Sequence, residues 1–547
     1  MNKRTFIPAQ AIIVIIIALF LTLSVFASPT EIIPDGFIGV YNAIDLTRML
    51  PDDNYILLDD IDMTGVSFTP IGTSAAPFTG IFDGNGHTIE GLSISSNAPY
   101  SAMFAYADNA EIKDLKLENA SIIINASSKT VYAAPICASA SNGTVISGCS
   151  VSAVADITAS TDVYAAGICA YSNGAHIKSS VADVDISVTT TKNISSIGGI
   201  AGYLFADSSV TDCENYGSLS GISADESYIG GIIGISKRDL NNTSKAKPAV
   251  SDSFNFADIS VSTKKNITVS CAGIAAKGEN LTVSGCKNTG DITASCPVGA
   301  IAAGISGYQS RNNINECANL GNVSATSTGA DAYAGGIVGE ANVATISSSY
   351  NNGSVFASGK QSTNAGGIFG HGTQFNKIEY CYNSGVNLSE AGSNIGTLIG
   401  SASYNDTCTT LYTLESTSHP AIGNRIDENA VTLLSSTQMK NAESFEGFDF
   451  VNVWYMPTDS ETGYPELVIF KPAEPVIILY GDVDNNGTVD SNDSVVLARY
   501  LAKWTGYDEI NEEDSDLNSD TVVDSTDSVI LSRHLAKWTG YDTLPLK

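Results

Sequence analysis

Gly335-Gly336-Ile337-Val338-Gly339 is one copy of a short element that recurs through the middle of the chain. A second element, Cys317-Ala318-Asn319-Leu320-Gly321, recurs with it. The apolar residue of the first element returns every 30 to 33 residues, with one step of 42, at Met103, Ile136, Ile168, Ile200, Ile232, Ile274, Ile305, Ile337, Ile368 and Leu398. A fixed period over so many copies predicts a solenoid in which each copy forms one coil.

The segments between these elements lack the 3.6-residue period of an amphipathic helix and instead alternate over four to six residues, as in Val323-Ser324-Ala325. Strands this short are not stable alone, but stacked coils pair each strand with its copy in the next coil. The sequence therefore predicts an all-β parallel β-helix with three strands and three turns per coil. About eleven coils at ~4.8 Å each would form a rod on the order of 50 Å long.

An Asn recurs once per coil, at Asn215, Asn255, Asn288, Asn319, Asn351 and Asn383. We expect these side chains to stack at one corner, with their amides bonded to one another and to the turn backbone, since Asn tolerates the left-handed conformation. The Gly that usually follows two residues later is expected to supply a positive φ. The alternative is that the Asn row binds a ligand.

Four of the ten cysteines, Cys213, Cys286, Cys317 and Cys381, occupy one position of the repeat. A cysteine that returns with the period is expected to be a small, buried, apolar residue with a free thiol. Because disulfides form readily in exported proteins, stacked neighbours such as Cys286 and Cys317 could instead form a disulfide.

The chain has 547 residues, 27 Lys+Arg and 58 Asp+Glu, and a net charge of −31. Binding to nucleic acid requires clustered Lys and Arg, and binding to anionic lipid requires basic segments, so this charge excludes both functions. At the start, Lys3 and Arg4 precede an apolar run from Ala11 to Ala27. This pattern predicts a secretory signal peptide over residues 1–27 and an extracellular mature protein; an uncleaved membrane anchor is the alternative.

Two segments near the end of the chain, 34 residues apart, have the spacing of calcium-binding loops. Ca²⁺ takes six to eight oxygen ligands, which such a loop supplies from positions 1, 3, 5, 7, 9 and 12, position 7 through its backbone carbonyl. The predicted ligands are Asp482, Asp484, Asn486, Thr488, Asp490 and Asp493 in the first loop, and Asp516, Asn518, Asp520, Val522, Asp524 and Asp527 in the second. Gly487 allows the bend at position 6, whereas the second loop has Thr521 there, which predicts a weaker second site.

Asp at position 12, one helix after each loop and the near-identical halves resemble a type I dockerin. The resemblance implies a calcium-stabilised module with two Ca²⁺ sites that binds a cohesin domain of a scaffoldin in a cellulosome-like assembly. It also implies the cohesin-contacting residues, which are Ser491, Asn492, Arg499 and Lys503 in the first half and Ser525, Thr526, Arg533 and Lys537 in the second. A solvated helix face is the alternative for Arg499 and Lys503, and the departure at Asn492 leaves the class of cohesin open.

The body of the chain resembles the GLUG-repeat surface proteins of bacteria. The resemblance rests on the opening segment from Tyr55 to Ile89, on the two repeated elements, and on the closing segment from Phe445 to Leu467. It implies a right-handed β-helix of the kind found in adhesins and exported proteins, and no particular reaction. The expected domains are repeats over residues 28–423, a C-terminal cap containing Trp454 over 424–471, a linker over 472–480 and the dockerin over 481–547.

The repeats contain few carboxylates, and the five histidines have no His-Glu-x-x-His spacing. Gly370-His371-Gly372 resembles a pectinase motif, but its usual acidic partners do not occur at neighbouring coils. We therefore expect a secreted, non-catalytic component that binds polysaccharide or cell-surface glycan, attached to a scaffoldin through its dockerin. The alternative is a β-helix polysaccharide lyase or glycoside hydrolase of the same assembly.

Overall fold

A computed structural model describes residues 33–546, apart from 128, 192–193, 240–246, 390–393, 416–418, 426–430, 459–462 and 473–478. The chain forms two compact units, residues 1–470 and 471–547, which are described separately below. The predicted signal peptide lies outside the described residues. No helix among those that are described is long and apolar enough to cross a membrane.

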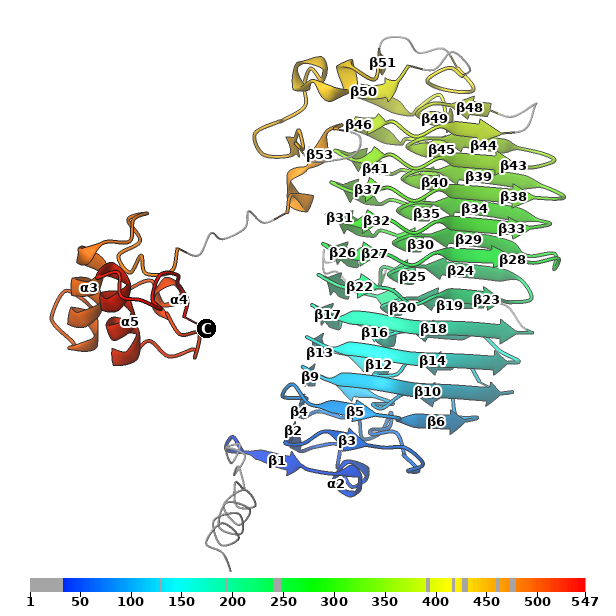
Figure 1. Ribbon diagram of the computed structural model, residues 1–547. Coiled ribbons are helices and arrows are strands. Elements are labelled where there is room, and N and C mark those ends of the chain that lie inside the picture. Colours follow the sequence, from blue (N-terminus) through cyan, green and yellow to red (C-terminus); the bar gives the residue numbers. More distant parts are fainter. Residues whose placement is uncertain are drawn as a thin grey trace, which may run out of the picture. The chain divides into compact units, whose positions relative to one another are not determined.

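The first unit is a parallel β-solenoid, which confirms the predicted fold class (Figure 1). Two sheets of ten strands each contain one short strand from each of ten successive coils. Sheet C consists of β7 (Tyr100–Ser101), β11 (Val131–Ala133), β15 (Val163–Ala166), β19 (Ile194–Gly198), β24 (Glu226–Gly230), β29 (Thr268–Ala272), β34 (Gly299–Ala303), β39 (Asp331–Gly335), β44 (Thr363–Gly366) and β48 (Asn394–Gly396). Sheet B consists of β8 (Ala107–Asp108), β12 (Cys137–Ser141), β16 (Cys169–Asn173), β20 (Ala201–Phe205), β25 (Ile233–Lys237), β30 (Ala275–Glu279), β35 (Ser306–Ser310), β40 (Val338–Asn342), β45 (Phe369–Gln374) and β49 (Ile399–Ser401).

The remaining face of the solenoid is sheet A, with 31 strands. Its first part contains β1 (Phe37–Val40), β2 (Asn54–Leu57), β3 (Ile61–Asp62), β4 (Ile81–Asp83), β5 (Thr88–Glu90), β6 (Ser93–Ser96), β9 (Glu111–Lys113), β10 (Lys116–Ala126), β13 (Val145–Ser147), β14 (Ser150–Ala159), β17 (His176–Lys178) and β18 (Val181–Thr190). Its second part contains β21 (Ser209–Thr211), β22 (Glu214–Asn215), β23 (Leu219–Ile222), β26 (Ala249–Ser251), β27 (Phe254–Asn255), β28 (Ile259–Ser262), β31 (Thr282–Ser284), β32 (Lys287–Asn288), β33 (Ile292–Cys296), β36 (Asn313–Asn315), β37 (Ala318–Asn319) and β38 (Val323–Ser327). It ends with β41 (Thr345–Ser347), β42 (Tyr350–Asn351), β43 (Val355–Ser358), β46 (Lys377–Asn383), β47 (Asn387–Ser389), β50 (Thr407–Leu414) and β51 (Val431–Leu434), while the short helix α2 (Ala43–Thr47) follows β1.

Buried and exposed side chains alternate along the strands, as expected for strands with one face in the core. In β18, the side chains of Ala182, Val184, Ile186 and Val188 are buried, and the residues between them are exposed. The buried residues of the coils together form one apolar core that runs from Val40 to Ile422. The short period-2 pattern in the sequence is therefore explained by a core repeated coil by coil.

The recurring Asn side chains form a continuous buried ladder, which confirms that part of the prediction. Each Nδ2 donates to the Oδ1 of the Asn in the next coil at 2.7–2.8 Å, from Asn215 through to Asn383. Each Nδ2 also donates to the carbonyl of the residue two positions later, as from Asn319 to Gly321 at 2.7 Å. Because these side chains are at most 1% exposed, the ladder is not accessible to a ligand.

The prediction for the backbone conformation at this corner is wrong in two respects. The Asn residues lie in extended strands, and positive φ occurs three residues earlier, at Asp212, Asp252, Gly285, Glu316, Ser348 and Tyr380. The Gly after the Asn does not have a positive φ either. It is needed because adjacent coils approach closely: a Cβ on Gly321 would lie 2.0 Å from the carbonyl oxygen of Gly290 in the preceding coil.

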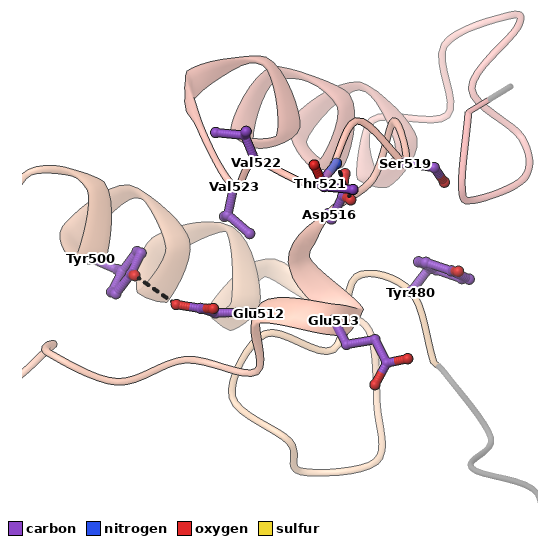
Figure 2. Close-up of a pocket in the computed structure, with 9 residues that line it drawn as sticks. All are labelled: Tyr480, Tyr500, Glu512, Glu513, Asp516, Ser519, Thr521, Val522 and Val523. Atoms are coloured by element: carbon purple, nitrogen blue, oxygen red, sulfur yellow. Dashed lines mark hydrogen bonds between the residues drawn. The ribbon is translucent and has the colours of Figure 1, made fainter. Parts of the chain in front are cut away.

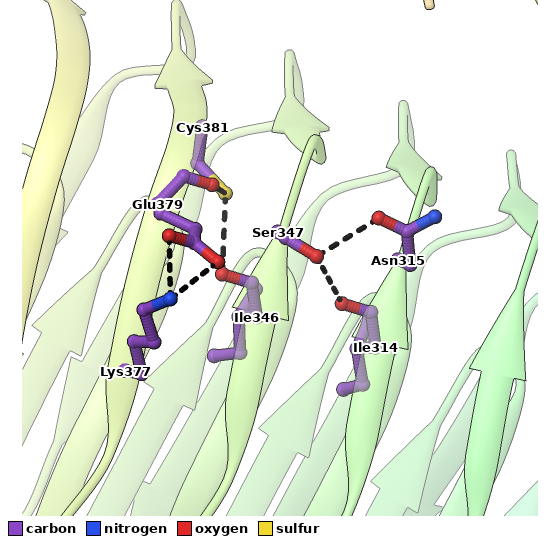
Figure 3. A network of polar contacts seen from close by, with 7 residues as sticks. All are labelled: Ile314, Asn315, Ile346, Ser347, Lys377, Glu379 and Cys381. Atoms are coloured by element: carbon purple, nitrogen blue, oxygen red, sulfur yellow. Dashed lines mark hydrogen bonds and ion pairs between the residues drawn. The ribbon is translucent and has the colours of Figure 1, made fainter.

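None of the ten cysteines forms a disulfide, and nine of them are buried, which confirms their apolar role. Burial raises the pKa of the Cys286 thiol well above its usual value, and the neighbouring Cys317 thiol adds to this shift. On the surface of sheet A, polar side chains join neighbouring coils, as where Ser347 Oγ donates to Asn315 Oδ1 at 2.8 Å (Figure 3). In the next coil, Lys377 and Glu379 form an ion pair at 2.8 Å.

The segment after the repeats contains η1 (Gln438–Lys440), η2 (Ala442–Ser444), β52 (Trp454–Tyr455), β53 (Glu466–Leu467) and η3 (Val468–Phe470). Trp454 is 1% exposed and belongs to an aromatic cluster with Tyr350, Tyr382 and Tyr412 from three successive coils. Tyr382 Oη donates to the carbonyl of Pro465 at 2.5 Å. The segment thus packs along the outside of several coils as well as next to the last one.

Candidate metal and partner-binding site

The described part of the second unit contains three helices, α3 (Ser491–Leu501), α4 (Glu512–Ser515) and α5 (Ser525–Leu535). Its core is small: among the residues described there, five apolar side chains are buried, namely Val483, Leu497, Leu517, Ile530 and Leu531. A core of this size gives little hydrophobic stabilisation, so this unit depends on further interactions in its loops.

The first loop brings together the oxygen atoms of three predicted ligands. One carboxylate oxygen from each of Asp482, Asp484 and Asp493 lies within 4.8 Å of the others. Asp482 accepts hydrogen bonds from the backbone N–H groups of Asn486 (3.0 Å) and Gly487 (2.8 Å), which fixes its orientation. The predicted ligands Asn486, Thr488 and Asp490 are exposed, and the Asp490 carboxylate does not belong to this acidic cluster.

The second loop repeats the backbone pattern of the first. Asp516 accepts from the N–H groups of Asp520 (3.2 Å) and Thr521 (2.9 Å), and Asp527 accepts from those of Leu517 (2.7 Å) and Asp524 (2.9 Å). Within the described part of this loop, no three acidic side chains converge as they do in the first. The reason is at position 3, where Asn518 replaces an Asp and donates to Asp520 Oδ2 at 2.7 Å.

The backbone at position 6 is more strained in the second loop than in the first. Gly487 has φ +83°, and Thr521 has φ +69°, a conformation that a β-branched residue rarely adopts. The Asp residues at positions 9 and 12 have a second role, because they form the capping boxes of the helices: Asp490 with Asp493 at α3, and Asp524 with Asp527 at α5. Each loop is therefore joined rigidly to the helix that follows it.

The chemistry of these side chains fits a calcium ion. Asp482, Asp493 and Asp527 are 0–2% exposed, and no ion pair joins them to a Lys or Arg of the described residues. Buried carboxylates are costly unless a cation compensates their charge. Burial also raises the pKa of Asp514, with a further contribution from the nearby Asp482 charge. A bound Ca²⁺ would be held by the oxygen atoms of Asp482, Asp484 and Asp493 and would neutralise this repulsion.

A hollow of about 540 Å³ lies beside the second loop (Figure 2). Glu512, Glu513 and Asp516 line it, and no basic residue does. Tyr500 Oη donates to Glu512 Oε1 at 3.3 Å across one side of it. The negative charge near the second loop thus extends beyond the predicted ligands.

The residues implied as cohesin contacts lie at equivalent places in the two halves. Ser491, Asn492 and Lys503 are exposed in the first half, as are Ser525, Thr526 and Lys537 in the second. The two Arg residues are half-buried: Arg499 lies over the rings of Trp504 (5.4 Å) and Tyr507 (4.9 Å), and Arg533 over those of Trp538 and Tyr541. Aromatic contacts of this kind hold the guanidinium groups in place, so they are not freely solvated.

The sequence analysis did not include Val495 of α3 or Val529 of α5 among the candidate contact residues. Val495 is 44% exposed and Val529 is 46% exposed. Val495 lies three residues after Asn492 and four before Arg499, and hence on the same face of α3. Helical spacing from the implied contacts was the signal that could have identified both valines.

Comparison with known proteins supports this unit's assignment. Residues 480–536 match the family model described as dockerin type I domain. No curated protein matches the chain. Among solved structures, the chain is similar to a protein from Bacteroides ovatus described as a "putative immunoglobulin A1 protease", at 16% identity and a TM-score of 0.30, covering 79% of this chain and 92% of that one. The chain thus consists of a parallel β-solenoid and a C-terminal type I dockerin domain, a module that implies a cohesin partner.

Proposed function

We propose that this protein is a secreted β-helix component that binds a scaffoldin through calcium-dependent docking of its second unit to a cohesin. The observation that carries the proposal is the duplicated pair of acidic loops, each followed directly by a capped helix, within residues that match the dockerin family. Dockerin proteins are typically extracellular or cell-surface components, in agreement with the predicted signal peptide.

Calcium would act on the structure of the docking surface. Asp490 and Asp493 belong both to the predicted metal site and to the first turn of α3, where Ser491 and Asn492 are exposed. A metal bound in the loop would therefore fix the start of the helix that carries the implied contacts. The same relationship holds for Asp524 and Asp527 at α5.

The internal duplication supports two equivalent docking orientations. Each half presents two exposed polar residues at the helix start, an exposed Val, a half-buried Arg over two aromatic rings, and an exposed Lys. Substitutions in one half would then leave the other available, so loss of binding requires both halves to be changed.

For the β-helix we propose the role of a non-catalytic component, of the GLUG-repeat kind, that binds polysaccharide or cell-surface glycan. Long regular surfaces of a solenoid suit binding to extended partners. One observation favours the second candidate, an enzyme acting on polysaccharide: Glu340 and His371 lie at paired positions of adjacent coils, and burial raises the pKa of Glu340 to about 7. A carboxyl group with such a pKa can donate a proton near neutral pH.

The experiment that tests the proposal is calorimetric titration of the full mature chain with a panel of cohesin domains, in calcium and after treatment with EDTA. We expect binding to at least one cohesin in calcium and none in EDTA. The variant Arg499→Ala should retain binding, whereas Arg499→Ala combined with Arg533→Ala should weaken it strongly. Binding that is equally tight in EDTA, or no binding to any cohesin, would overturn the proposal. Release of new sugar chain ends from polysaccharides would identify the enzyme instead.

A further inference from the structure

The outer surfaces of sheets B and C face one another across the bend between them. The rings of Tyr132 in β11 and Tyr171 in β16 meet edge to face at 5.4 Å, and those of Tyr164 and Tyr203 do so at 5.2 Å. These rings belong to different sheets and lie outside the main core. The outer faces of the two sheets therefore meet at a concave angle that follows the axis of the solenoid, called the groove below.

The groove changes character along its length. In its first part, Tyr100, Tyr132 and Tyr164 of successive coils stack at 4.8 and 5.4 Å, with interplanar angles of 14° and 13°. Each ring covers the face of its neighbour, so these faces are not free to stack on a ligand. We assign this Tyr ladder a structural role.

In the second part of the groove, the ladder is replaced by mixed side chains. On sheet B, Lys277, Tyr308, Glu340 and His371 occupy the same position in four successive coils. On sheet C, Tyr228, Ile301 and Tyr333 lie opposite them. A hollow of about 310 Å³ lies here, lined by Tyr228, Lys277, Tyr308 and the three carboxylates of Glu226, Glu279 and Glu340.

These side chains offer a defined set of contacts. Lys277 Nζ donates to Tyr228 Oη at 3.0 Å and lies 4.7 Å from the centre of that ring. Tyr308 is half-buried and lies between Lys277 and Glu340 in its row. A half-buried aromatic ring between charged groups provides both an apolar surface and several hydrogen-bonding groups.

The charge of the hollow is negative, because the carboxylates of Glu226 and Glu279 outnumber its one ammonium group, and Glu340 adds to this charge when it ionises. The whole chain has the same sign, with a net charge of −31. A polyanion such as a uronate polymer would be repelled by this field. An uncharged polymer with many hydroxyl groups would not be, and its hydroxyls can donate to the carboxylates.

We propose that the hollow between Tyr228 and Glu340 is the binding site of an uncharged linear polysaccharide that lies along the groove. Tyr308 is its aromatic contact, and Glu226, Glu279 and Glu340 accept hydrogen bonds from the sugar hydroxyls. A linear polymer fits because the groove presents a new set of contacts at each coil, at a spacing of ~4.8 Å. The inference rests on the proposed function, since it names the site and the ligand class of the polysaccharide-binding body.

The test is affinity electrophoresis and calorimetry of the full chain with soluble xyloglucan, galactomannan and mixed-linkage β-glucan, with polygalacturonate as the anionic polymer. We expect binding to at least one uncharged polymer and none to polygalacturonate. Tyr308→Ala should weaken binding about tenfold, the loss expected for an aromatic anchor. The isosteric Glu340→Gln should also weaken it, and Tyr404→Ala, at a residue 95% exposed outside the groove, should not.

Circular dichroism and unfolding of each variant establish that it is folded. Binding to polygalacturonate alone, binding unchanged by both Tyr308→Ala and Glu340→Gln, or no binding to any polymer would overturn the inference. Cohesin titration of the same samples separates the two proposals. A chain that binds polysaccharide but no cohesin contradicts the docking function alone, and a chain that binds cohesin while the groove variants still bind polysaccharide contradicts the groove alone.

Discussion

A Cβ atom on Gly304 would lie 2.1 Å from Cγ of Asn319, so the bend between sheets C and B touches the Asn ladder of sheet A inside the same solenoid. The relationship repeats in other coils, where a Cβ on Gly199 would lie 2.3 Å from Cγ of Asn215 and one on Gly336 would lie 2.3 Å from Cγ of Asn351. The Gly-Gly-apolar element and the Cys-x-Asn-x-Gly element of the sequence therefore pack against each other. This contact draws the bend inward, and the groove lies on its outer side.

Replacing Gly304 with Ala should destabilise the first unit. The added methyl group would meet both Asn319 and the carbonyl oxygen of Gly336, 2.2 Å away, and neither can move without breaking the ladder. Overpacking of this kind costs about 2–3 kcal/mol. Denaturant unfolding followed by far-ultraviolet circular dichroism measures the loss.

Gly299→Ala is the matched control for this substitution. Its Cβ would meet only Thr268, at 3.5 Å or more, and its φ is not in the left-handed region. We expect a change within about 0.5 kcal/mol, or a small stabilisation through the unfolded state. Equal destabilisation by both variants would show that the Gly304–Asn319 contact has no special role.

Much of this fold could be predicted from the sequence because a solenoid depends on contacts at a fixed period. The recurrence of Asn at one position of the repeat predicted the stacked ladder, and the recurrence of Cys predicted buried thiols. The reason for the glycines could not be predicted, because the close approach of Gly304 to Asn319 depends on how two sheets face each other. The groove was missed for a similar reason. Lys277, Tyr308 and Glu340 are 31 and 32 residues apart, the period itself, but no local pattern indicates that their row faces sheet C.

Thr521→Gly should stabilise the second unit. A non-glycine residue in the left-handed region costs about 1–2 kcal/mol, and Gly returns part of this through greater freedom of the unfolded chain. We expect a net gain of about 1 kcal/mol in the presence of calcium, measured by the fluorescence of Trp504 and Trp538 during unfolding. The reciprocal variant Gly487→Thr should lose stability, and the prediction is wrong if both variants change stability in the same direction.

Removal of calcium should unfold most of the second unit. Residues 481–547 contain 14 acidic and 5 basic residues, and their repulsion opposes a core of five buried apolar side chains. The circular dichroism of this isolated unit (471–547) should lose its helical signal in EDTA and regain it with excess calcium. Helical signal retained in EDTA would contradict this dependence.

Asp493→Asn should weaken the first calcium site more than any substitution of the exposed Asp490, because Asp493 is buried and belongs to the acidic cluster. Loss of one charged ligand from such a site lowers affinity by roughly tenfold or more. Calcium titration followed by calorimetry measures the two sites. Asp508→Asn, outside both loops, serves as the control and should leave both affinities unchanged.

The stability of the first unit should decrease as the pH rises through the range in which Glu340 ionises. Burial, with a smaller contribution from Asp331, raises the pKa of Glu340 from 4.5 to about 7, so the folded state holds this proton more tightly than the unfolded state does. The ionised side chain then costs stability above pH 7, by roughly 3 kcal/mol, and the cost disappears as the pH falls towards 4.5.

Glu340→Gln removes the ionisation at nearly constant volume. The variant should therefore be more stable than the natural chain at pH 8, and the two should be nearly equal at pH 4.5, by denaturant unfolding at each pH. A difference in stability that is the same at both pH values would mean that Glu340 does not ionise with a raised pKa in the folded protein. Glu415→Gln, at an exposed position just after β50, is the control.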